Sequence, residues 1–200
     1  MRKGIAGRLL TAAGVLLLLA SLLLLRENRL EAHHAEEYAA RKVSELREEA
    51  PATALPAELI AELPETEEVQ ELRVVSIDGY GYIGTLTLPE PMPELPIMAE
   101  WDYERLRLAP CRQFGSPLTD DLVIAAHNYP SHFGHLSELC EGDAVCFTDM
   151  DGRRNAYTVR EVRTLSPDEV DAVRESGFAL TLYTCSYGGK KRIAVFCDRA

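Results

Sequence analysis

A long apolar segment near the N-terminus constrains the fold of this chain more than any other feature. Residues 5–25 are almost entirely apolar, and eight leucines lie within Val15–Leu25. A helix of this length is about 30 Å long, which matches the hydrocarbon core of a bilayer. Because Arg2, Lys3 and Arg8 stand at its start, the positive charge predicts a cytoplasmic N-terminus. The rest of the chain is then expected on the outer side of the cell membrane.

A cleaved signal peptide is the alternative to a membrane anchor. The apolar run is longer than the core of an ordinary signal peptide, and no small-x-small cleavage pattern follows Leu25. We therefore expect residues 1–26 to form a cytoplasmic tip and an uncleaved anchor that crosses the membrane once.

The segment that follows is strongly acidic. Residues 27–71 contain 13 glutamates against four basic residues, and the whole chain has a net charge of −11, which argues against binding to nucleic acid. Residues 27–50 have a helical composition but few apolar positions, so we expect a solvated helical stalk. Residues 51–70 combine prolines with glutamates and predict an extended linker. We place the start of the folded domain near Leu72 and expect the stalk to hold that domain away from the membrane.

The sequence of residues 72–200 is typical of a mainly β domain. Runs of apolar or alternating residues bounded by turn residues predict strands at 82–88, 122–126, 145–148, 156–159, 178–184 and 192–196. Two helical segments are expected, over 133–139 and over 166–177, and the second starts with a capping box formed by Ser166 and Glu169. Many short strands with one or two helices indicate a closed or nearly closed β-barrel.

The last predicted hairpin carries the strongest chemical signal. Gly188 and Gly189 form a two-residue turn signal, and such a turn places Cys185 opposite Arg192 on the neighbouring strand. Opposed side chains on paired strands lie about 5 Å apart, and a nearby cation favours the nucleophilic thiolate. The guanidinium is also a suitable donor to a substrate carbonyl or an oxyanion.

A thiol nucleophile usually needs an acid/base partner, and three histidines are candidates. His127 directly follows the apolar run 122–126 and is expected at a strand end, whereas His132 and His135 are expected to be exposed in a loop or short helix. The spacing of the three fits no standard zinc motif, so we expect no metal and no cofactor. The alternative to a catalytic pair of Cys185 and His127 is a buried structural cysteine beside an incidental histidine.

Four further cysteines accompany Cys185. Cys146 and Cys197 alternate with apolar neighbours and are most simply packed core thiols. A disulfide among Cys111, Cys140, Cys146 and Cys197 is an open alternative, because the domain is expected outside the cell.

The residues around these positions resemble one enzyme family. Thr181-Leu-Tyr-Thr-Cys185 followed by Arg192 resembles the TLxTC…R signature of the sortases, the cysteine transpeptidases of Gram-positive cell surfaces. Ala125-Ala-His127 resembles the strand end that carries their catalytic histidine. Three more segments resemble strands of their barrel, namely residues 82–89, 95–97 and 142–147. The similarity spans about residues 72–200.

This resemblance implies an eight-stranded barrel and a specific reaction. Cys185 would attack the threonine carbonyl of an LPxTG-like sorting motif near the C-terminus of a secreted protein and form a thioacyl-enzyme. His127 would protonate the departing amine, and Arg192 would hold the carbonyl or the oxyanion. The acceptor would be an amine such as that of a peptidoglycan precursor. The resemblance further implies a substrate groove lined by Ala126, Tyr183 and Thr184.

Other functions fit the same residues. A cysteine peptidase or peptidoglycan hydrolase would use the same pair with water as the acceptor, and a pilin-polymerising sortase would use a lysine. A surface adhesion module would hold these residues for structural reasons only. We see no lid motif around Trp101 and no second apolar segment before Ala200, which favours an anchoring enzyme over a pilin polymerase.

Overall fold

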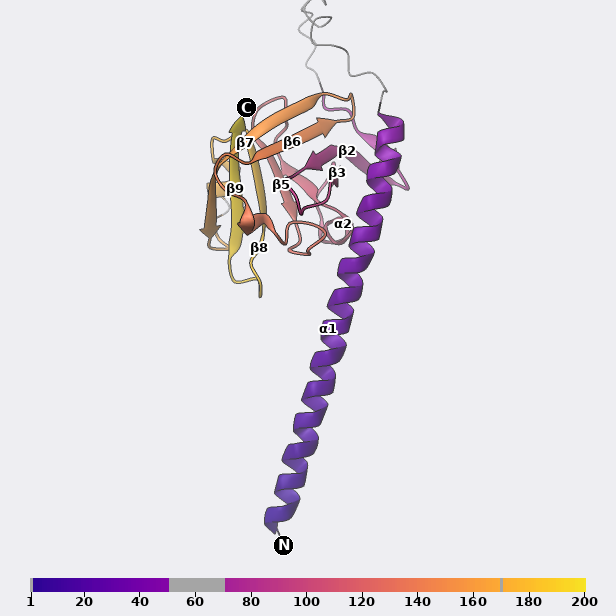
Figure 1. Cartoon of the computed structure of the whole chain (residues 1–200), viewed down its shortest axis with the longest axis vertical. Coiled ribbons are helices and arrows are strands. Elements are labelled where there is room, and N and C mark those ends of the chain that lie inside the picture. Colours follow the sequence, from indigo (N-terminus) through magenta and orange to yellow (C-terminus); the bar gives the residue numbers. More distant parts are fainter. Residues whose placement is uncertain (1, 51–70, 170) are drawn as a thin grey trace, which may run out of the picture.

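A closed ring of paired strands forms the body of the protein (Figure 1). The structure is a computed structural model and describes residues 2–50, 71–169 and 171–200. The ring follows the order β2-β3-β4-β5-β8-β9-β7-β6, and β6 pairs with β2 to close it, while β1 pairs with β2 as an additional strand. The expected eight-stranded barrel is therefore confirmed.

Six strands match those expected from the sequence, and β7 extends well beyond its expected range. The strands are β1 Val75–Ile77, β2 Tyr80–Thr87, β3 Leu95–Met98, β4 Cys111–Phe114, β5 Leu122–Ala126, β6 Ala144–Asp149, β7 Arg154–Leu165, β8 Leu180–Cys185 and β9 Arg192–Arg199. The helical elements are α1 Arg2–Glu49, α2 Tyr103–Leu108, the 3-10 turn η2 Leu136–Glu138 and α3 Asp171–Arg174. The strands β1 and β4 and the helix α2 were not expected from the sequence.

The two predicted helical segments are both shorter than expected. The segment 133–139 contains the single turn η2, and the segment 166–177 contains only the four residues of α3. The backbone N–H of Ser166 donates to the Glu169 carboxylate at 2.6 Å, which is one half of the expected capping box. The chain then makes a turn at residues 167–168, so the helix does not begin there.

Apolar side chains from most strands of the ring fill the barrel. This core includes Ile83, Leu86, Ile97, Ile124, Phe147, Val159, Leu182 and Val195. Large apolar groups of this kind stabilise a fold by about 1.5–3 kcal/mol each when they are fully buried. A second apolar cluster covers the outside of the barrel where α1 and α2 pack on it, and it includes Leu46, Tyr82, Met98, Leu106 and Ala125.

The second half of α1 packs along the barrel, so the expectation of a solvated stalk that holds the domain away is wrong. Ala35, Ala39, Val43 and Leu46 form a buried stripe on one face of the helix. The two alanines leave little side-chain bulk between the helix and the strands. The expected linker over residues 51–70 lies outside the described residues.

A buried lysine fixes α1 to the turn between β1 and β2. The Lys42 ammonium donates to Asp78 at 2.6 Å and to Glu45 at 2.5 Å, although the side chain is fully buried. Burial alone would lower the pKa of Lys42, but the bonds to the two carboxylates outweigh it and raise the pKa. Lys42 is therefore charged and paired, which is the condition under which a lysine is tolerated in a protein interior.

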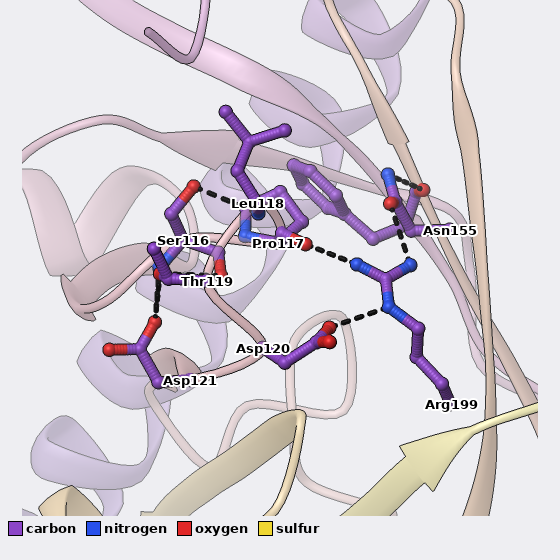
Figure 2. A network of polar contacts seen from close by, with 9 residues as sticks. Ser116, Pro117, Leu118, Thr119, Asp120, Asp121, Asn155 and Arg199 are labelled. Atoms are coloured by element: carbon purple, nitrogen blue, oxygen red, sulfur yellow. Dashed lines mark hydrogen bonds and ion pairs between the residues drawn. The ribbon is translucent and has the colours of Figure 1, made fainter. Parts of the chain in front are cut away.

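The start of β5 is held by an arginine from the end of β9 (Figure 2). The Arg199 guanidinium donates to the Asp120 carboxylate at 2.5 Å, to the Asn155 side-chain oxygen at 3.1 Å and to the Pro117 carbonyl. This contact joins the loop before β5 to β7 and β9. The position of β5 in the sheet is thus fixed at the end opposite to His127.

Closure of the barrel requires a glycine at residue 84. Gly84 pairs with Ile97 of β3 and with Asp149 of β6, next to an irregularity in the β2–β3 register. Its φ is +151°, and a Cβ at this position would lie 2.0 Å from the carbonyl oxygen of Thr148. Any side chain therefore forces β2 and β6 apart.

We expect Gly84→Ala to lower the free energy of unfolding by about 2–5 kcal/mol, because it combines backbone strain with a clash against a neighbouring strand. Gly79→Ala is the matched control, since Gly79 has a φ of +82° but no atom within 4 Å of the place that a Cβ would take. That variant should lose only about 1–2 kcal/mol from backbone strain. Denaturant unfolding of the detergent-solubilised chain, followed by circular dichroism, measures both losses. Equal losses in the two variants would contradict the closure argument.

Candidate active site

The pairing of three strands brings Cys185, His127 and Arg192 together. Strands β5 and β8 are parallel, with Ala126 beside Thr184. His127 directly follows β5, and Cys185 ends β8, so the two lie at the same level on neighbouring strands about 4.8 Å apart. On the other side, β9 is antiparallel to β8 and places Arg192 directly opposite Cys185, as the turn signal predicted.

The alternation of side chains puts these three residues on the outer face of the barrel. The even-numbered residues at the ends of β5 and β8 and the odd-numbered residues of β9 belong to the barrel interior, as shown by Leu122, Ile124, Ala126, Leu180, Leu182, Val195 and Cys197. Successive residues of a strand point to opposite faces. His127, Cys185 and Arg192 have the opposite parity and so face outward at one end of the sheet.

A buried hydrogen bond holds the two strand ends in place. The Thr184 hydroxyl donates to the Ala126 carbonyl at 2.8 Å. The Thr184 and Ala126 side chains are 3% and 4% exposed, so they join β5 to β8 inside the barrel. Tyr183 instead lies on the outer face, two residues before Cys185, and its hydroxyl donates to the Gln113 side chain. Burial raises the pKa of Tyr183 to about 12, so its hydroxyl stays protonated.

Cys185 differs from the buried cysteines in its access to solvent. All five cysteines are free thiols. Cys111 and Cys197 are buried, and burial raises the pKa of each to about 12, which makes both thiols poor nucleophiles. Cys185 and Cys146 are partly exposed, and Cys140 is exposed. Cys146 also lies beside an arginine, Arg154, but of these three Cys185 is the one that lies opposite an arginine in the strand register and level with the end of β5.

His127 is half-buried in a compact loop. The backbone N–H of Phe133 donates to the His127 carbonyl at 3.1 Å and folds the loop back on the end of β5. Burial lowers the pKa of His127, the charge of Arg107 lowers it further, and the charge of Glu31 opposes both. The neutral imidazole is therefore the dominant form near neutral pH.

The expectation that His132 is exposed is wrong. His132 is fully buried, and within the described residues neither of its ring nitrogens has a hydrogen-bond partner. Burial lowers its pKa to about 4, so it is neutral. The ring of Tyr129 lies 5.0 Å from the ring of His127 and 5.4 Å from that of His132, which makes a row of three aromatic rings. His135 is partly exposed, and its ring nitrogen lies 2.8 Å from the Glu138 carboxylate.

The helix α1 also reaches this site, which the sequence did not reveal. The Tyr129 hydroxyl donates to the Glu31 carboxylate at 3.3 Å, and the Ser131 hydroxyl donates to the Ala32 carbonyl at 3.2 Å. No local pattern links a glutamate in an acidic helix to a loop almost a hundred residues later. The effect of Glu31 on the charge around His127 follows only from the packing of α1 on the barrel.

Arg192 is the first residue of β9, directly after the turn that follows Cys185. Its guanidinium donates to the Gly189 carbonyl at 3.0 Å and to the Lys191 carbonyl at 3.1 Å, and the residue is partly exposed. Within the described ranges, no group of three or more His, Cys, Asp or Glu side chains is placed to hold a metal ion. The face therefore presents a thiol, an imidazole and a guanidinium, which can serve as nucleophile, acid/base and oxyanion donor.

Comparison with known proteins identifies the domain. A family model described as a sortase domain matches residues 86–200. No curated protein matches the chain. Several solved structures share its fold at low sequence identity.

Three of these structures illustrate the similarity. A Clostridium perfringens sortase D5 transpeptidase has a TM-score of 0.53 and 18% identity, covering 60% of this chain and 79% of its own. A pilus-related sortase C of Group B Streptococcus has a TM-score of 0.52 and 21% identity, covering 67% and 77%. A C. perfringens sortase C with the C-terminal cell wall sorting motif has a TM-score of 0.52 and 20% identity, covering 85% and 89%.

These structures show a common fold, and the family model adds the sequence signal. The match covers more than half of the 200 residues, from the last two residues of β2 to residue 200. The barrel topology and the family match agree, and on this evidence the chain belongs to the sortase family.

Proposed function

We propose that the protein is a membrane-anchored sortase that cleaves an LPxTG-like sorting motif and transfers the cleaved protein to an amine. The observation that supports this best is the strand register that sets Cys185 opposite Arg192 and level with His127. The substrates would be secreted proteins with a C-terminal sorting signal, and the acceptor an amine such as that of a peptidoglycan precursor.

In the proposed reaction the Cys185 thiol passes its proton to the neutral His127, and the resulting thiolate adds to the carbonyl carbon of the motif's threonine. Arg192 donates to the negative oxygen of the tetrahedral intermediate. The C–N bond then breaks, and His127 gives a proton to the departing amine, which leaves a thioester on the sulfur. An incoming amine attacks the thioester, His127 takes its proton, and the thiolate departs.

The anchor is supported by the first half of α1. Among the described helices, α1 is long and apolar enough to cross a membrane. Its leucines from Leu16 to Leu25 are all at least half exposed, so the protein itself does not bury them. Such a surface needs a nonpolar environment. With Arg2, Lys3 and Arg8 at the N-terminal end, we place that end in the cytoplasm and the barrel outside the cell.

The identity of the acceptor distinguishes the related functions. The fold similarity to a pilus-related sortase C keeps a second candidate, a pilin-polymerising reaction in which a lysine side chain is the acceptor. A peptidase would hydrolyse the same thioester, with water as the acceptor. Incubation with a sorting-motif peptide and either a glycine-type amine, a lysine peptide or no amine separates the three, because each gives a product of different mass.

We expect Cys185→Ala to abolish turnover, since no other group replaces the sulfur nucleophile. The assay is mass spectrometry of the full chain with a small library of sorting-motif peptides, read both for product and for an acyl adduct on Cys185. Cys146→Ala is the matched control, because Cys146 is also partly exposed but lies on β6, and it should keep both signals. Product formation by Cys185→Ala would refute the nucleophile assignment.

We expect Arg192→Lys to reduce kcat by about 100-fold or more, because an ammonium cannot reproduce the planar donor geometry of the guanidinium at an oxyanion. Arg154→Lys is the control, since Arg154 is an exposed arginine at the start of β7. Steady-state peptide cleavage measures both variants. An unchanged kcat in Arg192→Lys would remove this residue from the mechanism.

The pKa of His127 should respond in opposite directions to its two charged neighbours. Arg107 lowers this pKa and Glu31 raises it, so Arg107→Gln should raise it and Glu31→Gln should lower it. The imidazolium is the proton donor, so the alkaline limit of activity should move up in Arg107→Gln and down in Glu31→Gln. NMR titration of the ring, assigned with His127→Gln, gives the pKa, and shifts of the same sign would contradict this description of the site.

A further inference from the structure

The contacts of α1 show which end of the barrel lies nearest to the apolar segment of the helix. Counting from the N-terminus, the helix first meets the loop after β5 through Glu31 and Tyr129. It then meets the β1–β2 region through Lys42 and Asp78, and the β6–β7 turn through Leu46, which shares a cluster with Met150. The end of the barrel that carries the carboxyl end of β5 is therefore the one nearest to the apolar segment.

The turn between β8 and β9 lies at this same end. Because β8 runs parallel to β5, the carboxyl ends of both strands lie together, and the turn follows β8 directly. Figure 1 shows the loop after β8 at the lower end of the barrel, on the side toward the free N-terminal half of α1. Two independent features, the strand direction and the helix contacts, thus place the turn toward the apolar segment.

Only a short length of α1 separates the apolar segment from the first contact with the barrel. The last leucine of the apolar run is Leu25, and six residues later Glu31 contacts the barrel. At 1.5 Å per residue this separation is about 9 Å. The headgroup layer on each side of a bilayer is about 5–8 Å thick. An apolar run that spans the bilayer therefore brings this end of the barrel to the headgroups.

The residues of the turn fit such a surface. Tyr187 is 96% exposed, the highest value among the large apolar side chains that are exposed in the described barrel. Lys190 and Lys191 are exposed beside it, although the chain as a whole carries a net charge of −11. The Lys191 ammonium donates one bond to the Ser166 hydroxyl at 3.3 Å, and the Glu169 carboxylate accepts from the Ser166 N–H. Tyrosine side chains favour the membrane interface, and lysines are attracted to anionic headgroups.

We propose that the β8–β9 turn, residues 186–191, docks on the anionic lipid headgroups of the membrane in which α1 is anchored. This inference rests on the proposed anchor. Docking holds Cys185, two residues before Tyr187, just above the bilayer. A substrate whose cleavage site lies next to its own membrane segment would then meet the sulfur without leaving the surface.

The test uses the full chain in vesicles with a fluorescent reporter in the turn. Trp101 is the single tryptophan, so Trp101→Phe gives a dark background into which Tyr187→Trp is introduced. Vesicles of phosphatidylglycerol and phosphatidylcholine carry bromine near the headgroups as a quencher. Arg153→Trp in the same background is the matched control, because the β6–β7 turn packs near Leu46, about 22 Å farther along α1 than Glu31.

We expect bromolipid to quench the reporter of Tyr187→Trp and to leave that of Arg153→Trp unchanged. Lys190→Gln and Lys191→Gln should each reduce the ratio of docked to undocked turn about fivefold. Vesicles of phosphatidylcholine alone should reduce it about 25-fold, because they remove the attraction of both lysines. Quenching of both reporters, or of neither, would overturn the proposal. If quenching is unchanged in both lysine variants and in uncharged vesicles, the anionic headgroup is not the binding partner.

Two further readouts separate this proposal from the proposed function. Vesicle flotation reports the anchor, and a chain that does not float refutes the anchor together with the docking. Cleavage of a soluble sorting-motif peptide reports the catalytic residues. A floating, active chain without quenching at residue 187 would refute the docking alone.

Discussion

The parallel pairing of β5 with β8 is the constraint on which the site depends. It sets the end of one strand level with the end of the other, and the buried bond from the Thr184 hydroxyl to the Ala126 carbonyl fixes that level. A shift of one residue would move His127 away from Cys185 and turn one of them into the barrel. The Arg199 contacts at the opposite end of β5 and the closure of the ring at Gly84 restrain the same strand from further away.

The electrostatics of the site come from a wider part of the molecule than its three central residues. Glu31 of α1 and Arg107 of α2 act on His127 with opposite sign. The Tyr129 ring lies between His127 and the buried His132, and its hydroxyl is bound by Glu31. The helix that carries the apolar segment is thus part of the surroundings of the imidazole, and its packing bears on the protonation of His127.

Much of this could be predicted from the sequence, for physical reasons that differ by element. The β8–β9 register was predicted correctly, with Cys185 opposite Arg192, although the turn is longer than the expected two residues Gly188 and Gly189. The Gly189 N–H donates to the Ser186 carbonyl and the Ser186 N–H to the Lys191 carbonyl, and this loop keeps the same pairing as a two-residue turn. The strands β1 and β4 are short and lack a clear alternation. His132 looked exposed because its loop is polar, yet the loop folds onto the barrel. The buried face of α1 was missed because it is built from alanines and from Lys42, whose charge is compensated by Asp78 from a distant turn.

The packing of α1 also determines where the chain divides into independent parts. The composition of the chain changes near residue 72, but the face that Leu46 covers includes Tyr82, Met98 and Met150 of the barrel. A recombinant fragment that begins at residue 72 would expose this apolar face of the barrel to solvent and make the fragment prone to aggregation. One that begins just after the apolar run keeps this face covered and retains Glu31. The physical unit of this protein therefore begins some forty residues before the point at which its sequence changes character.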